Sequence, residues 1–279
     1  MKEIATDIYI EQNSLGLFTG IIQSEKGLVL IDSPLRPVDG DLWKGSISPD
    51  ECCKQCYMIV LDTNYDRLLS IKGSECAIVA HSGAMVPIRG RTPKVSEDPQ
   101  QHLENPETMI SGNRMLPPEL IFDDELSFHI DGMEISLEHH SGSNHAGIWV
   151  VIPERKVVFV GDAVVVDQPP FLAYANLHTW EADLETLSSE KFKDYLVVSS
   201  RSGVVDSEQV KAMKKQIVNI HDTFNTLKES NAPIEEWHNK IPEFLARFSQ
   251  LDLFNSELFY NRLHWGITTY YEFNCREKG

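Results

Sequence analysis

The centre of the predicted fold is the segment Leu61-Asp62-Thr63-Asn64-Tyr65-Asp66-Arg67-Leu68. Residues 57–61 are apolar and predict a buried strand, and residues 68–71 begin a helical pattern. Polar side chains at the carboxyl end of a buried strand, where the chain turns into a helix, are typical of an α/β active site. The loop carries two carboxylates, an amide and a guanidinium, so we expect it to form part of a functional site.

Apolar and β-branched runs continue on both sides of this segment. The expected strands cover residues 8–10, 17–22, 27–32, 57–61, 76–81, 126–130, 133–138, 147–152, 157–160 and 195–198. Helices are expected from residue 179, over 206–228, over 234–248 and over much of 253–272. Two strand-rich halves, each followed by helices, predict an α/β protein. We expect a four-layer αββα sandwich over residues 1–205 and a helical extension over 206–279 that packs on the same domain.

Residues 82–118 form the least regular part of the chain, rich in Pro, Gly and polar residues. An irregular segment of this length inside a domain is usually functional, for example as a lid or a binding loop. A surface insertion is the alternative, and the sequence favours neither.

The charge balance excludes two classes of partner. The formal net charge of −17 argues against nucleic acid, because neutralising phosphates requires a basic face. It argues equally against an anionic membrane surface. No apolar run approaches the roughly 20 residues that cross a bilayer, and residues 1–7 lack the hydrophobic region of a signal peptide. We therefore expect a cytoplasmic protein.

Cysteine usage agrees with that compartment, because an odd number, five, fits reduced thiols. The run Cys53-Lys54-Gln55-Cys56, with Cys52 before it, suggests a metal site. A structural zinc site needs four ligands, usually from two such pairs, and the chain has no second pair. We expect ordinary thiols at the end of a helix.

Three later segments follow in a recognisable order. They are His140-Ser141-Gly142-Ser143-Asn144-His145-Ala146-Gly147-Ile148, then a strand–turn–strand from Trp149 to Gly161-Asp162, then Val197-Val198-Ser199-Ser200-Arg201-Ser202. In order and spacing they resemble the loops of the metallo-β-lactamase superfamily, the fold of zinc β-lactamases, glyoxalase II and related hydrolases. The resemblance covers roughly residues 4–205 and implies the αββα fold.

The resemblance assigns seven positions to the family's dinuclear metal site. The family's first loop reads His-x-His-x-Asp-His, and its second, His-Thr-Pro-Gly-His-Thr-Pro-Gly-Ser, contains a metal-binding His. A Gly-Asp supplies the bridging carboxylate, and the last loop carries another His. In this chain those positions are occupied by Asp62, Asn64, Asp66, Arg67, Asn144, Asp162 and Arg201.

None of the family's five imidazoles stands at its expected place, and only Asp66 and Asp162 remain as inherited ligands. Arginine stays protonated, has no lone pair to donate and repels a dication. Arg67 and Arg201 are instead suited to pair with the carboxylates. The resemblance and its departures together predict a salt-bridged pocket with no metal or other cofactor.

Three functions remain open. The first is a protein without zinc hydrolase activity, whose pocket binds a small anionic ligand or a protein partner or is merely structural. The second is an ester or thioester hydrolase that holds a divalent metal ion through Asp62, Asn64, Asp66 and Asp162, because oxygen donors suit magnesium, calcium or manganese. The third is a subunit whose helices over 206–272 scaffold a complex or a homo-oligomer. No catalytic residue is assigned.

Two histidines beside Asn144 are additional candidates for the site. His145 would reach the metal position only with a one-residue shift, which breaks the spacing to Gly147. His140 is expected to be a hydrogen-bonded structural histidine.

Overall fold

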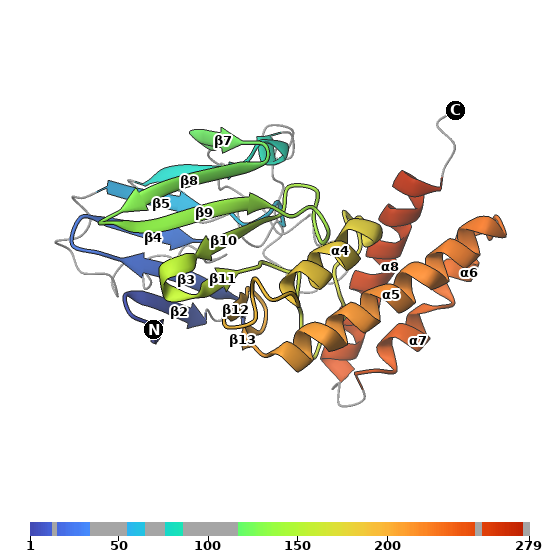
Figure 1. The fold of residues 1–279 in the computed structure, drawn as a ribbon. Coiled ribbons are helices and arrows are strands. Elements are labelled where there is room, and N and C mark those ends of the chain that lie inside the picture. The colour runs from blue at the N-terminus through green and yellow to red at the C-terminus, as the bar shows by residue number, and fades with distance from the viewer. Residues whose placement is uncertain (13–15, 34–54, 65–75, 86–116, 249–252, 276–279) are drawn as a thin grey trace.

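Two β-sheets pack face to face, and helices gather at one side of the sandwich (Figure 1). The computed structural model describes residues 1–12, 16–33, 55–64, 76–85, 117–248 and 253–275. Predictions for other residues, among them the helix expected after residue 68 and most of the 82–118 segment, lie outside this description.

The first sheet has seven strands in sequence order, antiparallel from β1 to β4 and parallel from β4 to β7. The strands expected over residues 57–61 and 76–81 pair in parallel as β5 and β6. The strands are β1 (Lys2–Ala5), β2 (Ile8–Gln12), β3 (Phe18–Gln23), β4 (Gly27–Ile31), β5 (Gln55–Ile59), β6 (Ala77–His81) and β7 (Leu120–Phe122).

The second sheet has six strands in the order β13-β12-β11-β10-β9-β8. Only β11 and β12 run parallel, and α4 connects them along the chain. Their parallel alignment brings the loops after both strands to one edge of the sheet. The strands are β8 (Glu125–Ile130), β9 (Met133–His139), β10 (Ile148–Ile152), β11 (Val157–Phe159), β12 (Leu196–Ser199) and β13 (Gly203–Val205).

The described helices are α4 (Leu177–Leu187), α5 (Ser207–Glu229), α6 (Ile234–His238), α7 (Ile241–Leu245) and α8 (Leu253–Asn274), with short 3₁₀ turns η3 (Ser82–Ala84) and η5 (Pro153–Arg155). The single helix expected over 234–248 is wrong, because the chain forms α6 and α7 there. Pro242 has no N–H to donate to the carbonyl of His238, so the first helix ends at that residue.

Apolar side chains form a core between the sheets and another under the helices. Alternate residues of both sheets, such as Val29 and Val150, fill the first core. The outer face of the second sheet joins α4–α8 through buried residues such as Trp149, Trp180 and Trp237. The predicted α/β sandwich with C-terminal helices is confirmed.

Cys56 corrects the expectation of reduced thiols at the end of a helix. It lies in strand β5 and forms a disulfide with Cys76, just before β6. Parallel pairing of β5 with β6 sets the two Cα atoms 4.4 Å apart, within bonding range. Among the described residues, Cys275 is the free cysteine, and Cys52 and Cys53 lie outside the description.

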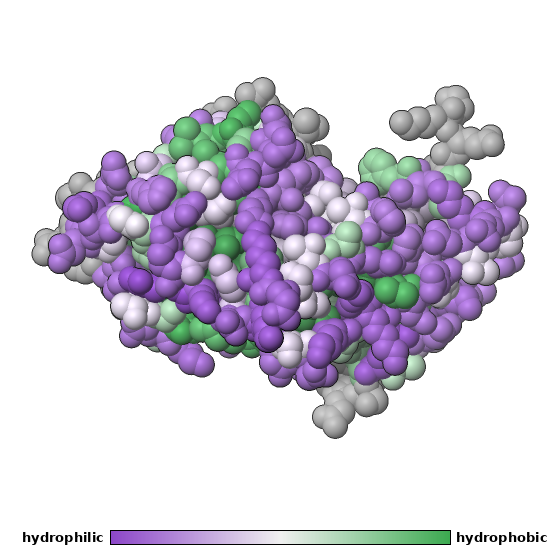
Figure 2. All heavy atoms as spheres, viewed as in Figure 1, coloured by the Kyte–Doolittle hydropathy of each residue, from purple (hydrophilic) through white to green (hydrophobic). Residues whose placement is uncertain are grey.

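Hydrophilic residues dominate the face in Figure 2, with a hydrophobic area over β7, where Leu120 and Ile121 are exposed. No helix within the described ranges combines the length and the apolar character needed to span a membrane.

Candidate functional site

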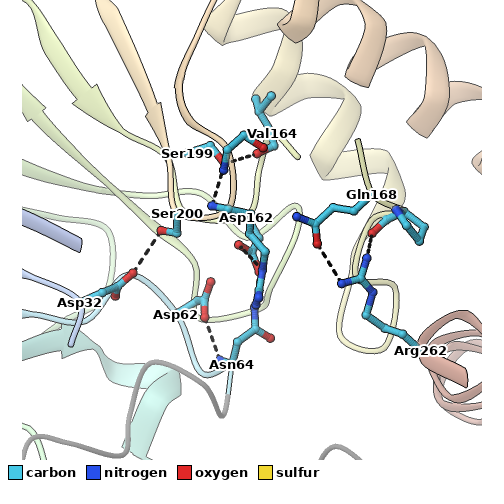
Figure 3. A network of polar contacts seen from close by, with 12 residues as sticks. Asp32, Asp62, Asn64, Asp162, Val164, Gln168, Ser199, Ser200 and Arg262 are labelled. Carbon is cyan, nitrogen blue, oxygen red and sulfur yellow. Dashed lines mark hydrogen bonds and ion pairs between the residues drawn. The ribbon is translucent and has the colours of Figure 1, made fainter. Parts of the chain in front are cut away.

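The loop after β5 carries the first candidate residues into the interior. Asp62 and Thr63 are each only 2% exposed. The backbone N–H of Asn64 donates to Asp62 Oδ1 at 2.8 Å, which turns the chain immediately after the strand (Figure 3). The next candidates, Asp66 and Arg67, lie outside the described residues.

Asp162 is the centre of the polar network. Arg201 Nε donates to its Oδ1 and Oδ2 at 3.1 Å each, and Asn64 Nδ2 donates to Oδ2 at 2.9 Å. The side chains of Arg201 and Asp162 are 8% and 0% exposed, so this ion pair is buried. Asp162 follows β11 and Arg201 follows β12, so the parallel strands place both at one sheet edge.

Hydroxyl groups hold the turn that carries Arg201. Ser199 Oγ donates to Val164 O at 2.5 Å and accepts from the backbone N–H groups of Arg201 and Ser202 (Figure 3). Ser200 Oγ donates to Asp32 Oδ2 at 3.2 Å.

Asp32 links the two sheets at the site. Its Oδ1 accepts from the Leu61 N–H at 2.9 Å, so one buried carboxylate ties the loop after β5 to the loop after β12. Sequence reasoning did not single out Asp32 as a site residue. Its position directly after the apolar strand β4 is the signal that could have found it.

Asn144 joins the network through Thr63. Its Oδ1 accepts from Thr63 Oγ1 and from the Ala146 N–H, both at 3.0 Å, and the residue is 1% exposed. The loop closes because Gly147 N–H donates to Asn144 O. A Cβ at Gly147 would lie 2.6 Å from His140 O, so this tight turn requires glycine.

The two histidine candidates make different contacts. His140 Nδ1 lies 2.8 Å from Asp183 Oδ1, and its ring stacks on Trp149. Burial alone would lower the pKa of His140, but hydrogen bonds to Asp183 and Glu138 outweigh burial and raise it. His145 contacts Tyr174 edge to face, with ring centroids 6.0 Å apart.

Sequence reasoning missed two residues that border the site, Phe171 and Arg262. The guanidinium carbons of Arg201 and Arg262 each lie 4.1 Å from the ring centroid of Phe171. Arg262, on α8, also donates to Gln168 Oε1 at 3.0 Å and to Pro169 O at 2.5 Å (Figure 3). No local sequence pattern marks this contact, because it joins α8 to a loop about 90 residues earlier.

Among the described residues, the groups that surround the Asp162 carboxylate are N–H donors rather than lone pairs. A zinc ligand must present a lone pair, whereas Asn64 Nδ2 and Arg201 Nε direct N–H groups at Asp162. Within the described ranges, no group of three or more His, Cys, Asp or Glu side chains is arranged to hold a metal ion.

Comparison with known proteins identifies the architecture. Residues 74–199 match the family model described as the metallo-beta-lactamase superfamily. The chain has the metallo-β-lactamase fold. The matched range contains Asn144 and Asp162, and the loop resemblance is confirmed over that range. A comparison with curated proteins found no match.

Solved structures share the metallo-β-lactamase fold at low identity. The metallo-beta-lactamase from Pontibacter korlensis is 16% identical with a TM-score of 0.60, and the alignment covers 78% of this chain and 98% of that protein. DIM-1 metallo-beta-lactamase is 13% identical with a TM-score of 0.59, covering 78% and 96%.

A longer protein aligns with the C-terminal helices as well. The stereoselective inverting sec-alkylsulfatase Pisa1 from Pseudomonas sp. is 14% identical with a TM-score of 0.68. The alignment covers 99% of this chain but 50% of Pisa1, so the chain spans about half the length of that neighbour.

Proposed function

We propose that this protein is a metallo-β-lactamase-fold protein that works without zinc, and that its former metal site is a binding pocket rather than a hydrolytic centre. The observation that carries the proposal is the buried ion pair between Arg201 and Asp162. The resemblance gives Asp162 the role of bridging carboxylate, and Arg201 occupies both of its oxygens.

A metal ion would have to displace these donors. It would leave the guanidinium of Arg201 buried without its carboxylate, beside a dication that repels it. The same contacts weigh against the hydrolase alternative with oxygen ligands, because Asp162 and Asn64 are hydrogen-bonded to each other.

We propose a small anionic molecule as the ligand. Arg201 and Arg262 bring two guanidinium groups to one aromatic ring beside the pocket, and planar guanidinium groups suit carboxylates and sulfates. Pisa1, whose fold extends over the same helices, is an alkylsulfatase, so a short alkyl sulfate is a reasonable first probe.

Metal analysis tests the loss of zinc. Protein purified without chelators from zinc-supplemented medium should contain well under about 0.1 metal ion per chain. EDTA and added zinc, manganese or calcium should leave its melting temperature unchanged, because only a ligand that binds the folded state raises stability. Zinc or another divalent ion at stoichiometric occupancy would contradict the proposal.

A restored site provides the positive control. Arg201→His together with Asn144→His and Asn64→His returns three imidazoles to family positions, and this variant should bind more zinc than the parent protein. If the parent already binds as much zinc as the variant, the proposed loss is wrong.

We also propose that residues 206–279 belong to the same folding unit as residues 1–205. Met213 and Ile217 of α5 share a hydrophobic cluster with Trp149 and Val151 of β10. Unfolding followed by tryptophan fluorescence and by circular dichroism should therefore give one coincident transition, and two separate transitions would contradict this arrangement.

A further inference from the structure

Asn144 has a buried side-chain nitrogen that no described group satisfies. Its Nδ2 atom is buried and has no hydrogen-bond partner, although the residue is 1% exposed. The orientation of the amide is fixed, because the Ala146 N–H can only donate and must therefore face Oδ1. Buried donors in folded proteins are nearly always paired, so this atom requires an explanation.

Asn144 lies close to the polar network around Asp162 through its contact with Thr63. Asn144 Oδ1 accepts from Thr63, whose neighbour Asn64 donates to Asp162. The family resemblance aligns Asn144 with a metal-binding His, and Asn64 and Arg201 with two more ligand positions. The nitrogen therefore belongs to a residue that hydrogen bonds connect with the loop after β5, and this loop contacts Asp162.

A second residue shows why location matters. Asn219 Nδ2, on α5, is likewise buried without a partner. It lies in the middle of α5 rather than in one of the loops that carry Asp162 and Arg201. An unpaired amide alone does not define a site, and Asn219 provides the matched control for Asn144.

The polarity of the site indicates what Asn144 binds. Asn64 Nδ2 and Arg201 Nε present N–H groups, and Asp162 accepts both of them. Asn144 Nδ2 presents N–H groups that no carboxylate accepts. Because N–H groups cannot coordinate a cation, the group that satisfies Asn144 must carry a lone pair.

We propose that Asn144 Nδ2 is a ligand-binding donor that takes an oxygen acceptor of a small molecule at the former metal position. The shared chemistry is an accessible oxygen, supplied by a carboxylate, a sulfate or a carbonyl group. This inference rests on the proposed zinc-free pocket and specifies how that pocket holds its ligand.

Nuclear magnetic resonance tests the inference directly. In the ¹⁵N-labelled protein, the side-chain NH₂ signals of Asn144 are assigned by their disappearance in Asn144→Asp, which keeps the shape and the Oδ1 acceptor. The protein is then titrated separately with acetate, methyl sulfate and acetamide. We expect the Asn144 signals to shift and saturate with at least one of these probes.

Affinity measurements on variants give a second readout. Asn144→Asp should weaken binding of the responding probe by roughly 3- to 10-fold or more, because it removes one hydrogen bond. Asn219→Asp makes the same chemical change elsewhere and should leave the dissociation constant unchanged. An equal effect of both variants would overturn the inference.

The three probes separate this inference from the proposed function. A shift with acetamide alone supports Asn144 as the donor and overturns an anionic ligand. If acetate or methyl sulfate binds but the Asn144 signals do not shift, the proposal of an anionic ligand stands. The inference about Asn144 is then overturned. Signals that respond to none of the probes, and instead show close contact with water, also overturn it.

Discussion

Arg201 donates from Nε to both carboxylate oxygens of Asp162, at 3.1 Å each, in a position where neither side chain is more than 8% exposed. The two residues are 39 apart in the sequence and come from the loops after neighbouring parallel strands. Under the proposed function, this pairing supplies the charge balance that a bound metal ion would otherwise provide. We therefore expect that breaking the pair destabilises the site and that its buried guanidinium opposes metal binding.

Removing one partner of the Arg201–Asp162 ion pair should lower the stability of the protein. Asp162→Asn leaves the guanidinium of Arg201 buried without its opposite charge, and we expect a loss of about 3–5 kcal/mol in the free energy of unfolding, measured with urea. Lys211→Ala removes an exposed pair with Glu208 and should change stability by about 0.5 kcal/mol at most. Equal effects of the two variants would contradict a buried ion pair.

His140 should make stability depend on pH. Its pKa is raised above the ordinary 6.5 by Asp183 and Glu138, against the opposing effect of burial. Its contribution is therefore fully present below about pH 6.5 and is lost as pH rises through the folded-state pKa. The stability difference between the wild type and His140→Gln should shrink over that range.

Urea midpoints at a series of pH values measure this difference. Comparing the two proteins at each pH removes the opposite contributions of His81 and His238, whose pKa values are lowered, first of all by burial. A difference that grows with pH would mean that the Asp183 contact does not favour the charged imidazole.

The disulfide should contribute to stability. Cys56 and Cys76 are 20 residues apart, and closing a loop of that length stabilises a protein by about 3 kcal/mol. Reductant should lower the urea midpoint of the wild type, whereas Cys56→Ser should be insensitive to reductant. Cys275→Ser, at the free cysteine, should behave like the wild type. Titration of five free thiols in the untreated, unfolded protein would disprove the bridge.

Arg262 should hold α8 on the loop beside the site. Arg262→Met keeps most of the side-chain volume but removes the donors to Gln168 Oε1 and to the buried carbonyl of Pro169. We expect a loss of about 1–3 kcal/mol in the free energy of unfolding, because a buried acceptor loses its partner. Arg247→Met, at an exposed arginine, serves as the control and should have little effect.

A related measurement checks the coupling to the pocket. If the contact of Arg262 with Phe171 helps to position Arg201, then Arg262→Met should also change the affinity for the responding probe. Unchanged affinity together with lower stability would restrict Arg262 to a structural role.

The sequence alone predicted the sandwich and named Asn64, Asp162 and Arg201 as candidates for the site. Alternating apolar residues predict strands locally, and the order of loops around Gly161-Asp162 carries the family resemblance without any knowledge of contacts. It also places Asn144 and Arg201 where the resemblance expects imidazoles, because residue type at an aligned position is a property of the sequence.

Only the tertiary structure decided which of these groups meet. The Asn64–Asp162 hydrogen bond spans 98 residues, and Arg262 reaches Pro169 across 93, so both depend on how separate strands and helices pack. The Cys56–Cys76 bridge likewise follows from the parallel neighbours β5 and β6. Only the folded structure shows that the side-chain nitrogen of Asn144 is buried without a hydrogen-bond partner, because the neighbours of a buried atom come from separate parts of the chain.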